Sequence, residues 1–457
     1  MNSTSKLMDG SIPRLLLKFS LPAIVGMLVH ALYNVVDSIF VGRGVGELAL
    51  AGITVCFPIV IILMAFVMLI GMGATTLISI RLGEDRLKEA ERIAGNAFGL
   101  FFIIGIVLTL LGLMFIEPLL VLFGASKDVL PFAIQYMQII LLGSIFMAIG
   151  IGMNNFIRAE GNPKMAMYTM VIGAITNIIL DYIFIFIFHW GIRGAAIATV
   201  IAYMVSGIWV LYYFLSGNSL IKIRIRNLRP EQQIVRTIMT VGFPAFAMQI
   251  TSCVQNLILN RSLVYYGGDL ALAAIGILMS VATLLVMPVI GISQGAQPII
   301  GFNYGANELE RVKTAVKLSV FVATLVVSIG FIITRLWPEQ LIKLFNRNQQ
   351  LIELGTNAIS IFFLFLPLVG LQLIGAGYFQ AVGKPIQATI LSLSRQVIIF
   401  IPLLLILPVY MGLDGIWRTA ALSDLGAFVL TGAWLLYEIK HLGRTGKVNE
   451  DIDYREY

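Results

Sequence analysis

Two carboxylates stand inside long apolar stretches of the sequence and are the first residues equipped for chemistry. Asp37 lies in HALYNVVDSIFVGRG. Asp181 lies in ITNIILDYIFIF, four residues after Asn177 and therefore on the same face of a helix. An aspartate near the centre of a membrane helix costs about 2.5–3.5 kcal/mol. A hydrogen bond across helices returns only ~0.6 kcal/mol, so packing alone does not account for the two residues.

A cation site accounts for them better. Two carboxyl groups held together away from water can take up a proton near neutral pH. The same oxygens, with the amide of Asn177 and the hydroxyl of Thr199 in AAIATVIAYM, can instead hold Na⁺, which prefers hard oxygen ligands. The residue types leave both ions open. We predict a cation-coupling site at Asp37, Asn177, Asp181 and Thr199, with Asp37 and Asp181 as possible Na⁺ ligands and no other cofactor.

The surrounding sequence is typical of an all-α membrane protein. Of its 457 residues, 59% are hydrophobic and 12% are charged, and the mean hydropathy is +0.93. A soluble domain is about half apolar and about a quarter charged. Apolar segments long enough to cross a hydrocarbon core recur along the chain and lack the alternation of barrel strands. We predict twelve transmembrane helices, at 15–41, 50–80, 93–116, 130–156, 165–188, 193–215, 235–264, 270–302, 313–335, 352–381, 386–410 and 413–437.

The basic residues predict the orientation in the membrane. Most lysines and arginines fall in the head, the tail and those loops that share a side with them, which places both termini in the cytoplasm. We expect the N-terminal segment to be retained and the protein to be a monomer of the inner (cytoplasmic) cell membrane. The basic residues do not gather on one face, so no nucleic acid partner is expected. Two cysteines and three histidines without metal-ligand spacing suggest no redox or further metal role.

The chain repeats itself at an offset of 222 residues. LPAI at 21–24 matches FPAF at 243–246, and ELALAGI at 47–53 matches DLALAAI at 269–275, while Gly46, Gly73 and Gly83 match Gly268, Gly295 and Gly305. We predict two homologous six-helix bundles in a parallel 6+6 repeat: an N-terminal lobe at 1–216, a cytoplasmic linker at 217–234 and a C-terminal lobe with a short tail at 235–457. Such paired bundles are the usual plan of secondary transporters.

Further residues are candidates for shaping a cavity between the lobes. Methionines and aromatic side chains could provide an adaptable apolar lining, namely Met248, Met279, Met287, Phe57, Tyr136, Phe156 and Phe246. The matched prolines Pro22 and Pro244 either bend continuous helices or begin helices. In the second half, Arg418 and Asp424 are six residues apart and are not expected to pair, and snorkelling explains Arg261 and Arg418.

Together these features resemble the MATE (multidrug and toxic compound extrusion) family, in particular its MepA-like bacterial branch. The likeness covers nearly the whole chain and includes LYNVVDSIFVGRGVGELALAGI at 32–53 and NNFIRAEGNPKMAM at 154–167. It implies a V-shaped pair of lobes that exchange drugs for Na⁺ or H⁺. It also implies that the cation site lies in the N-terminal lobe at the four residues named above, with Tyr136 and Asn154 as nearby polar groups and Pro22 as the bending proline. No acidic residue lies inside spans seven and eight, only Asp269 at the loop edge, which disfavours a coupling site in the C-terminal lobe.

The sequence therefore predicts a secondary active antiporter that exports hydrophobic, often cationic compounds by alternating access. No ATP-binding loop is present, so transport would draw on an ion gradient. One alternative is a lipid-linked oligosaccharide flippase of the same superfamily, which should line its cavity with several cationic residues. A second is a membrane-embedded enzyme acting on lipid with His30 and Asp37, but no nucleophile or metal constellation accompanies them, and we do not expect an enzyme.

Overall fold

The computed structural model describes residues 10–217, 219–345 and 348–442, and within those ranges it is helical, without strands. Ten helices are long and apolar enough to cross a membrane. Two further pairs of helices, each bent at a short break, bring the number of spans to twelve when each pair counts as one. The expected all-α membrane class is confirmed.

The first half of the chain supplies six spans. Four are mainly single helices: α2 (Ile12–Gly44), α3 (Glu47–Gly83), α4 (Leu87–Met114) and α10 (Gly191–Leu215). The fourth span in chain order is the bent pair, with α6 (Leu130–Leu142) followed by α7 (Ser144–Met147), the π-helix η1 (Ala148–Gly152) and α8 (Asn154–Ala159). The fifth is α9 (Pro163–Tyr182) with the π-helix η2 (Ile183–Ile187). Between the third and fourth spans lies the short helix α5 (Ile116–Leu122).

The second half supplies the other six, after the short 3₁₀-helix η3 (Ile225–Leu228). Two spans form one element, α11 (Gln232–Gly305), and are followed by α12 (Leu309–Leu336) and the short α13 (Pro338–Lys343). The second bent pair joins α14 (Gln349–Phe362) to α15 (Val369–Ala381) through the 3₁₀-helix η4 (Leu366–Leu368). The last two spans are α16 (Pro385–Leu393), η5 (Ser394–Phe400) and α17 (Ile401–Met411), and then α18 (Leu413–His441).

Matched glycines form the turn between the first two spans of each half. Gly46, between α2 and α3, has φ 122°, and Gly268, inside α11, has φ 63° and ψ −160°. Residues other than glycine rarely adopt these backbone conformations. Gly268 thus separates the seventh and eighth spans, which the sequence predicts at 235–264 and 270–302.

The two bent spans are a feature that the sequence does not predict. The span expected at 130–156 turns by 57° between Leu142 and Ser144, and that at 352–381 turns by 43° between Phe362 and Leu366. A glycine, Gly143, lies at the first break. At the second, η4 contains Pro367, which has no N–H to continue a helical hydrogen-bond ladder.

Pro22 and Pro244 both lie inside helices. α2 begins at Ile12 and α11 at Gln232, about three turns before each proline. The helix-start interpretation is therefore wrong for both residues. Each proline removes one hydrogen bond from a helix that continues on either side.

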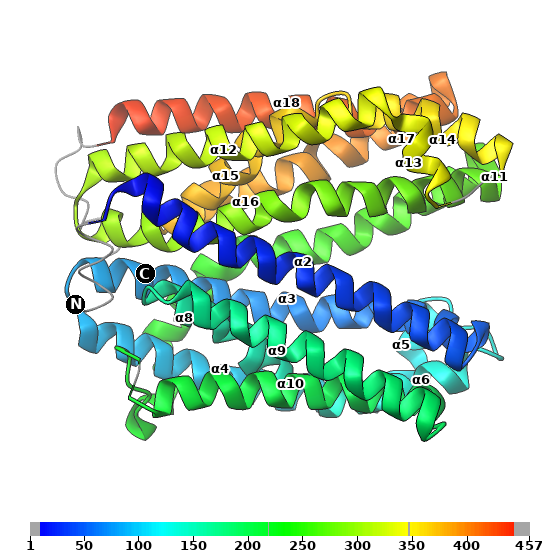
Figure 1. Cartoon of the computed structure of the whole chain (residues 1–457). Helices are drawn as coiled ribbons and strands as arrows, with labels where there is room; N and C mark the ends of the chain where they lie inside the picture. The colour runs from blue at the N-terminus through cyan, green and yellow to red at the C-terminus, as the bar shows by residue number, and fades with distance from the viewer. Residues whose placement is uncertain (1–9, 218, 346–347, 443–457) are drawn as a thin grey trace.

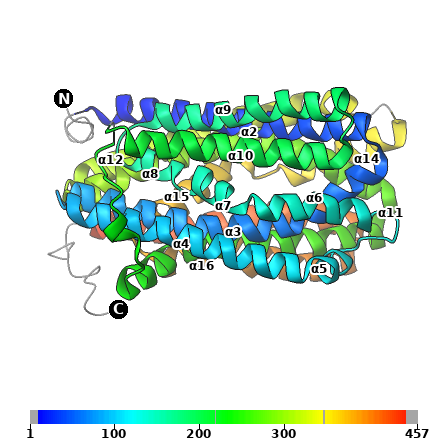
Figure 2. The ribbon, with the colours of Figure 1, turned by 90° about the horizontal axis from the view of Figure 1, so that it is seen from below.

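The spans form two bundles that lie side by side. Figure 1 shows the first-half helices α3, α4, α9 and α10 in one layer and the second-half helices α12, α14, α15 and α18 in the other, with α2 running along the boundary. The start of α2 and the end of α18 lie at the same end of the molecule (Figure 1). Seen from below in Figure 2, α7 and α8 lie between α9 and α10 on one side and α3 and α4 on the other.

Glycines bring the two bundles into backbone contact at that same end. A Cβ built on Gly83 would lie 2.0 Å from the carbonyl oxygen of Phe302, and one built on Gly305 would lie 2.1 Å from that of Ile80. These two contacts exchange under the 222-residue offset, as do those of Gly73 with α11 and of Gly295 with α2. We call this contact zone of α2, α3 and α11 the seam. One hydrophobic core continues across it, whereas a second lies within the second half.

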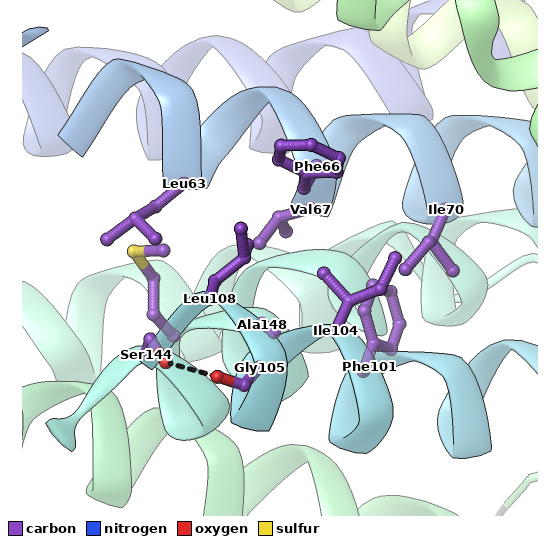
Figure 3. A pocket seen from close by; sticks show the side chains of 11 residues that line it. Leu63, Phe66, Val67, Ile70, Phe101, Ile104, Gly105, Leu108, Ser144 and Ala148 are labelled. Atoms are coloured by element: carbon purple, nitrogen blue, oxygen red, sulfur yellow. Dashed lines mark hydrogen bonds between the residues drawn. The ribbon is translucent and has the colours of Figure 1, made fainter. Parts of the chain in front are cut away.

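A small void inside the first bundle is distinct from the functional site. Leu63, Ile70, Phe101 and Leu108 surround it, and Ser144 beside it donates to the carbonyl oxygen of Gly105 (Figure 3). Its volume is about 10 Å³, enough for one water molecule at most. It is a packing defect of α3, α4 and α7.

Candidate transport site

A cavity of about 450 Å³ lies between the two bundles. Residues of both halves line it, from α2, α3, α9 and α10 on one side and from α11 and α15 on the other. Seven methionines contribute: Met27, Met64, Met68, Met72, Met170, Met248 and Met287. Methionine side chains are flexible and polarisable, so this lining can adapt to differently shaped apolar ligands.

The two intramembrane aspartates lie next to each other beside this cavity. Asp37 comes from α2 and Asp181 from α9, and their carboxyl groups lie close together. Asp181 is fully buried, and neither of its carboxyl oxygens has a hydrogen-bond partner among the other described groups. Asp37 Oδ1 is likewise buried and unpartnered there. Unpaired buried carboxylates are costly, so this arrangement calls for a proton or a cation.

Asn177 and Thr199 complete the cluster and separate the aspartates from the cavity. Asn177 Nδ2 donates to Thr199 Oγ1 at 3.4 Å, and Thr199 Oγ1 donates to the carbonyl oxygen of Ala195 at 3.0 Å. Asn177 Oδ1 has no partner within the described chain. Both residues line the cavity, which does not reach Asp181 directly. Two carboxylates, one amide oxygen and one hydroxyl are a donor set that suits Na⁺ as well as a proton.

Two tyrosines at this cluster are not among the residues predicted from the sequence. Tyr33 and Tyr203 line the cavity and lie close to each other and to Asp37. A signal for both exists in the sequence. Tyr33 precedes Asp37 by four residues and Tyr203 follows Thr199 by four, so each shares a helix face with a predicted cation-site residue.

The predicted cavity residues divide into two groups. Asn154, Met248 and Met287 line the cavity, and Asn154 donates Nδ2 to the carbonyl oxygen of Ala166 while its Oδ1 stays unpartnered among the described groups. The others lie outside the lining. Phe57 is 62% exposed, and Phe156 and Tyr136 are buried, the first against Phe101 and the second near Asp37. Met279 packs against the second core, and the ring of Phe246 contacts that of Phe66. Apolar residue type alone does not identify a cavity wall.

Among the described residues of the second half, the one buried intramembrane carboxylate is neutralised. Asp424 of α18 forms an ion pair with Arg395 of η5, with Nε and Oδ1 2.7 Å apart. Arg418 is exposed, in agreement with the expectation that it does not pair with Asp424. The partner escaped prediction because it lies on a neighbouring helix, outside any local spacing rule. A carboxylate already paired with a guanidinium is a poor candidate for binding a further cation.

At its seam end the cavity has a polar floor. Arg158 of α8 is 6% exposed, donates to Asn155 Oδ1 at 2.5 Å and donates to Gln294 Oε1 of α11 at 2.8 Å. The second bond joins the two bundles. Gln297 and Gln380 line the same cavity from the second half.

Comparison with known proteins agrees with this geometry. The MatE family model matches residues 22–183 and, a second time, residues 244–406. The chain belongs to the MatE family. The two matches begin 222 residues apart, which is the offset of the internal repeat. As a member of this family of transporters it is not an enzyme, and the membrane-enzyme alternative falls away.

The similarity to other members of the family covers nearly the whole length of the chain. It is 27% identical to the multidrug export protein MepA of Staphylococcus haemolyticus over 434 residues, which cover 95% of each protein. A solved ligand complex of the MATE multidrug transporter DinF-BH is 39% identical, with a TM-score of 0.88 over 94% of this chain and 96% of that one. An outward-facing MATE transporter of the MOP superfamily superimposes with a TM-score of 0.90 at 26% identity, over 96% and 98% of the two chains.

Proposed function

We propose that this MATE transporter is an antiporter that exports hydrophobic, often cationic small molecules in exchange for Na⁺ or H⁺. The observation that carries the proposal is a cluster of buried oxygens at Asp37, Asn177 and Asp181, in and directly behind the cavity wall, that have no hydrogen-bond partner among the described residues. Such a cluster is stable only when a cation or protons compensate its charge. A cationic substrate in the adjoining cavity would compete for the same negative field.

We further propose that the seam faces the cytoplasm of a bacterial inner membrane. The described part of the basic linker, the start of α2 and the end of α18 lie at the seam end, where the positive-inside rule places the cytoplasm. Both termini would then be cytoplasmic. In this assignment the lobes at 1–216 and 235–457 are closed on the inside, and the cavity is accessible from the outside. We expect each chain to work as a monomer.

The mechanism follows from mutual exclusion. With the lobes open to the cytoplasm, an amphipathic cation enters the methionine-lined cavity, attracted by the carboxylates of Asp37 and Asp181. After the lobes rock outward, Na⁺ or H⁺ binds between these carboxylates and removes that attraction, so the substrate leaves. Because either ligand weakens the other, their binding free energies are coupled. Bending of α2 at Pro22, and of α11 at Pro244, would let the helices follow the change.

Transport by purified protein in liposomes tests the proposal. A sodium gradient alone and then a proton gradient alone should show which ion drives ethidium movement. Asp37→Asn and Asp181→Asn should each reduce gradient-driven transport to near the protein-free level while the protein remains monodisperse. If both variants transport ethidium as well as the parent under the driving gradient, the cation site is wrongly assigned.

The flippase alternative predicts a different cavity. A pyrophosphate headgroup needs several cationic side chains, but among the described residues that line the cavity Arg158 is the single arginine and there is no lysine. One guanidinium cannot neutralise a pyrophosphate. The cavity therefore favours smaller and less charged ligands.

A further inference from the structure

Arg158 is a buried cation whose hydrogen-bond partners in the described chain are all neutral. It lies at the seam end of the cavity, where Asn155 Oδ1 and Gln294 Oε1 accept two of its five N–H donors. Removing a guanidinium from water costs several kcal/mol, and amide oxygens carry no charge to offset that cost. The residue therefore differs from an ordinary structural arginine.

No carboxylate in the described part of the chain lies within 4.0 Å of Arg158. Glu160, two residues away, points elsewhere, since its carboxylate accepts from Ser219 Oγ at 2.8 Å and from the backbone N–H of Leu220 at 2.9 Å. The other arginine buried to this degree, Arg81, is paired with Glu84 and with Glu89. Within the described residues the fold neutralises one deeply buried arginine and leaves the other, in the cavity wall, without a counter-charge.

A second unpartnered donor lines the same cavity. Gln380 Nε2 of α15 is buried without a hydrogen-bond partner among the described residues, and Gln380 itself is 9% exposed. Gln294, which accepts from Arg158, and Gln380 both line the cavity from the second half. A guanidinium without a counter-charge and an amide N–H without an acceptor can each bind an acceptor on a ligand, and a carboxylate also supplies the charge that Arg158 lacks.

We propose that Arg158 at the cavity floor is a specificity-determining residue, which binds the carboxylate of those amphipathic substrates that carry one. The inference deepens the proposed export function and rests on it. Asn154, beside Asn155, bonds to Ala166 of α9, and Asp181 follows Ala166 by fifteen residues, or about 22 Å of helix. The cavity thus has a positive floor at one end and, behind its wall towards the other end, the acidic pair Asp37 and Asp181. Elongated zwitterions match this polarity.

Two dyes that differ only at a carboxyl group test the assignment. Rhodamine 6G is an ethyl ester with a cationic ring system, and rhodamine 19 is the corresponding free acid. Fluorescence polarisation with the purified full-length protein at pH 7.5 gives the Kd of each dye. We expect Arg158→Gln to lower the ratio of the ester Kd to the acid Kd at least fivefold relative to the parent. Arg158→Lys should keep at least half of the parent ratio, because it keeps the charge.

Gln294→Ala distinguishes recognition of the substrate carboxylate by Arg158 from the hydrogen bond that Arg158 makes to Gln294 between the bundles. It removes the acceptor of that bond and leaves the guanidinium in place, so both dyes should be affected by the same factor and the ratio should stay. An unchanged ratio in Arg158→Gln, or an equal loss of the ratio in Gln294→Ala, overturns the carboxylate site while export of the ester still supports the proposed function. If the parent protein neither binds nor exports either dye, the proposed function itself fails.

Discussion

At the scale of single residues, Thr199 contributes an uncharged oxygen to the proposed cation site, next to two carboxylates. Its removal therefore tests whether the hydroxyl binds the cation. Thr199→Val keeps the side-chain shape but removes an oxygen that accepts from Asn177. Loss of one neutral hydrogen-bonding group costs about 1–2 kcal/mol, so we expect the cation concentration for half-maximal transport to rise roughly tenfold. The maximal rate should change little, because both carboxylates remain.

The control for Thr199→Val is Thr389→Val. The hydroxyl of Thr389 makes the same kind of intrahelical bond, to the carbonyl oxygen of Pro385 at 2.7 Å, but it lies on α16, away from the cluster. This variant should transport with the parent's cation dependence. If Thr199→Val leaves the half-maximal concentration unchanged, Thr199 is a structural neighbour of the site and not a ligand.

Glu160 gives a residue-scale prediction outside the membrane spans. Burial raises the pKa of its carboxyl group to about 7, although Ser219 and the backbone of Leu220 and Ile221 donate to it. A carboxyl whose folded pKa is raised stabilises the fold at low pH, and this contribution is lost as pH rises from about 4.5 towards 7. Between pH 5 and 8 the parent should therefore lose stability, on the order of 3 kcal/mol.

Glu160→Gln should remove this component of the pH dependence. Thermal unfolding followed at pH 5, 6, 7 and 8 in one detergent gives the comparison. The melting temperature of the parent should fall more steeply with pH than that of the variant, whatever their difference at pH 5. Parallel curves for the two proteins would show that the carboxyl group does not titrate in this range.

The candidate site could be predicted from the sequence only where a residue contrasts with its surroundings. Asp37, Asp181 and Asn177 are conspicuous in apolar helices, and the structure places them together. Phe57 and Phe156 are two of many apolar residues, and whether such a side chain faces lipid, core or cavity depends on helix rotation and on the gap between the lobes. Neither property is encoded in local spacing. The lack of a counter-charge at Arg158 could not be predicted for the same reason, since it depends on which described side chains surround the guanidinium in the folded protein.

At the scale of secondary-structure elements, the number and approximate positions of the spans could be predicted, but their breaks could not. The bend between Leu142 and Ser144 lies in a continuous apolar segment, and the π-helices η1, η2 and η5 show no distinct composition. These irregularities arise from packing. A Cβ built on Gly143, for example, would lie 2.4 Å from the side chain of Val200 of α10. Because α10 approaches so closely, the bend has room for glycine only. Hydropathy alone does not contain this information.

The seam glycines give an element-scale prediction. A methyl group at position 305 would lie 2.1 Å from the carbonyl oxygen of Ile80, and backbone atoms cannot yield without moving α11 away from α3. Gly305→Ala should therefore destabilise the closed seam. In a background with Cys56 and Cys253 replaced by alanine, a cysteine at Ser79, which is 1% exposed, should react several-fold faster with a membrane-impermeant maleimide.

Gly276→Ala is the matched control for Gly305→Ala. Gly276 belongs to the same element, and a Cβ at this position would meet nothing within 4 Å in the described chain. Its labelling rate should equal that of the parent. Equal rates for Gly305→Ala and the parent would mean that the seam tolerates the methyl group and that these glycines do not hold the lobes together.

At the scale of the whole molecule, the repeat explains why the two lobes can meet symmetrically at one end. Gly83 contacts Phe302 and Gly305 contacts Ile80, and the offset of 222 exchanges the two pairs. The offset could be predicted from sequence, whereas the pairing of each glycine with the opposite lobe could not, because a repeat does not specify which surfaces face each other. Alternating access requires these contacts to separate, while the cation cluster lies within one lobe and can stay intact.

A disulfide across the seam therefore tests alternating access directly. Gly301 of α11 lies opposite Ser79 of α3, and its built Cβ is 3.0 Å from the Cβ of Ser79, short of the ~3.8 Å of a typical disulfide by an amount that a small helix shift supplies. In the cysteine-free background, Ser79→Cys with Gly301→Cys should cross-link under mild oxidation. Gradient-driven transport should then fall to the protein-free level and return on reduction, whereas each single-cysteine variant should be insensitive to oxidant. The locked protein should still bind rhodamine 6G, because the closed seam is the state in which the structure shows the cavity. Full transport by the cross-linked protein would mean that the seam stays closed throughout the cycle, and the rocking-lobe mechanism would have to be abandoned.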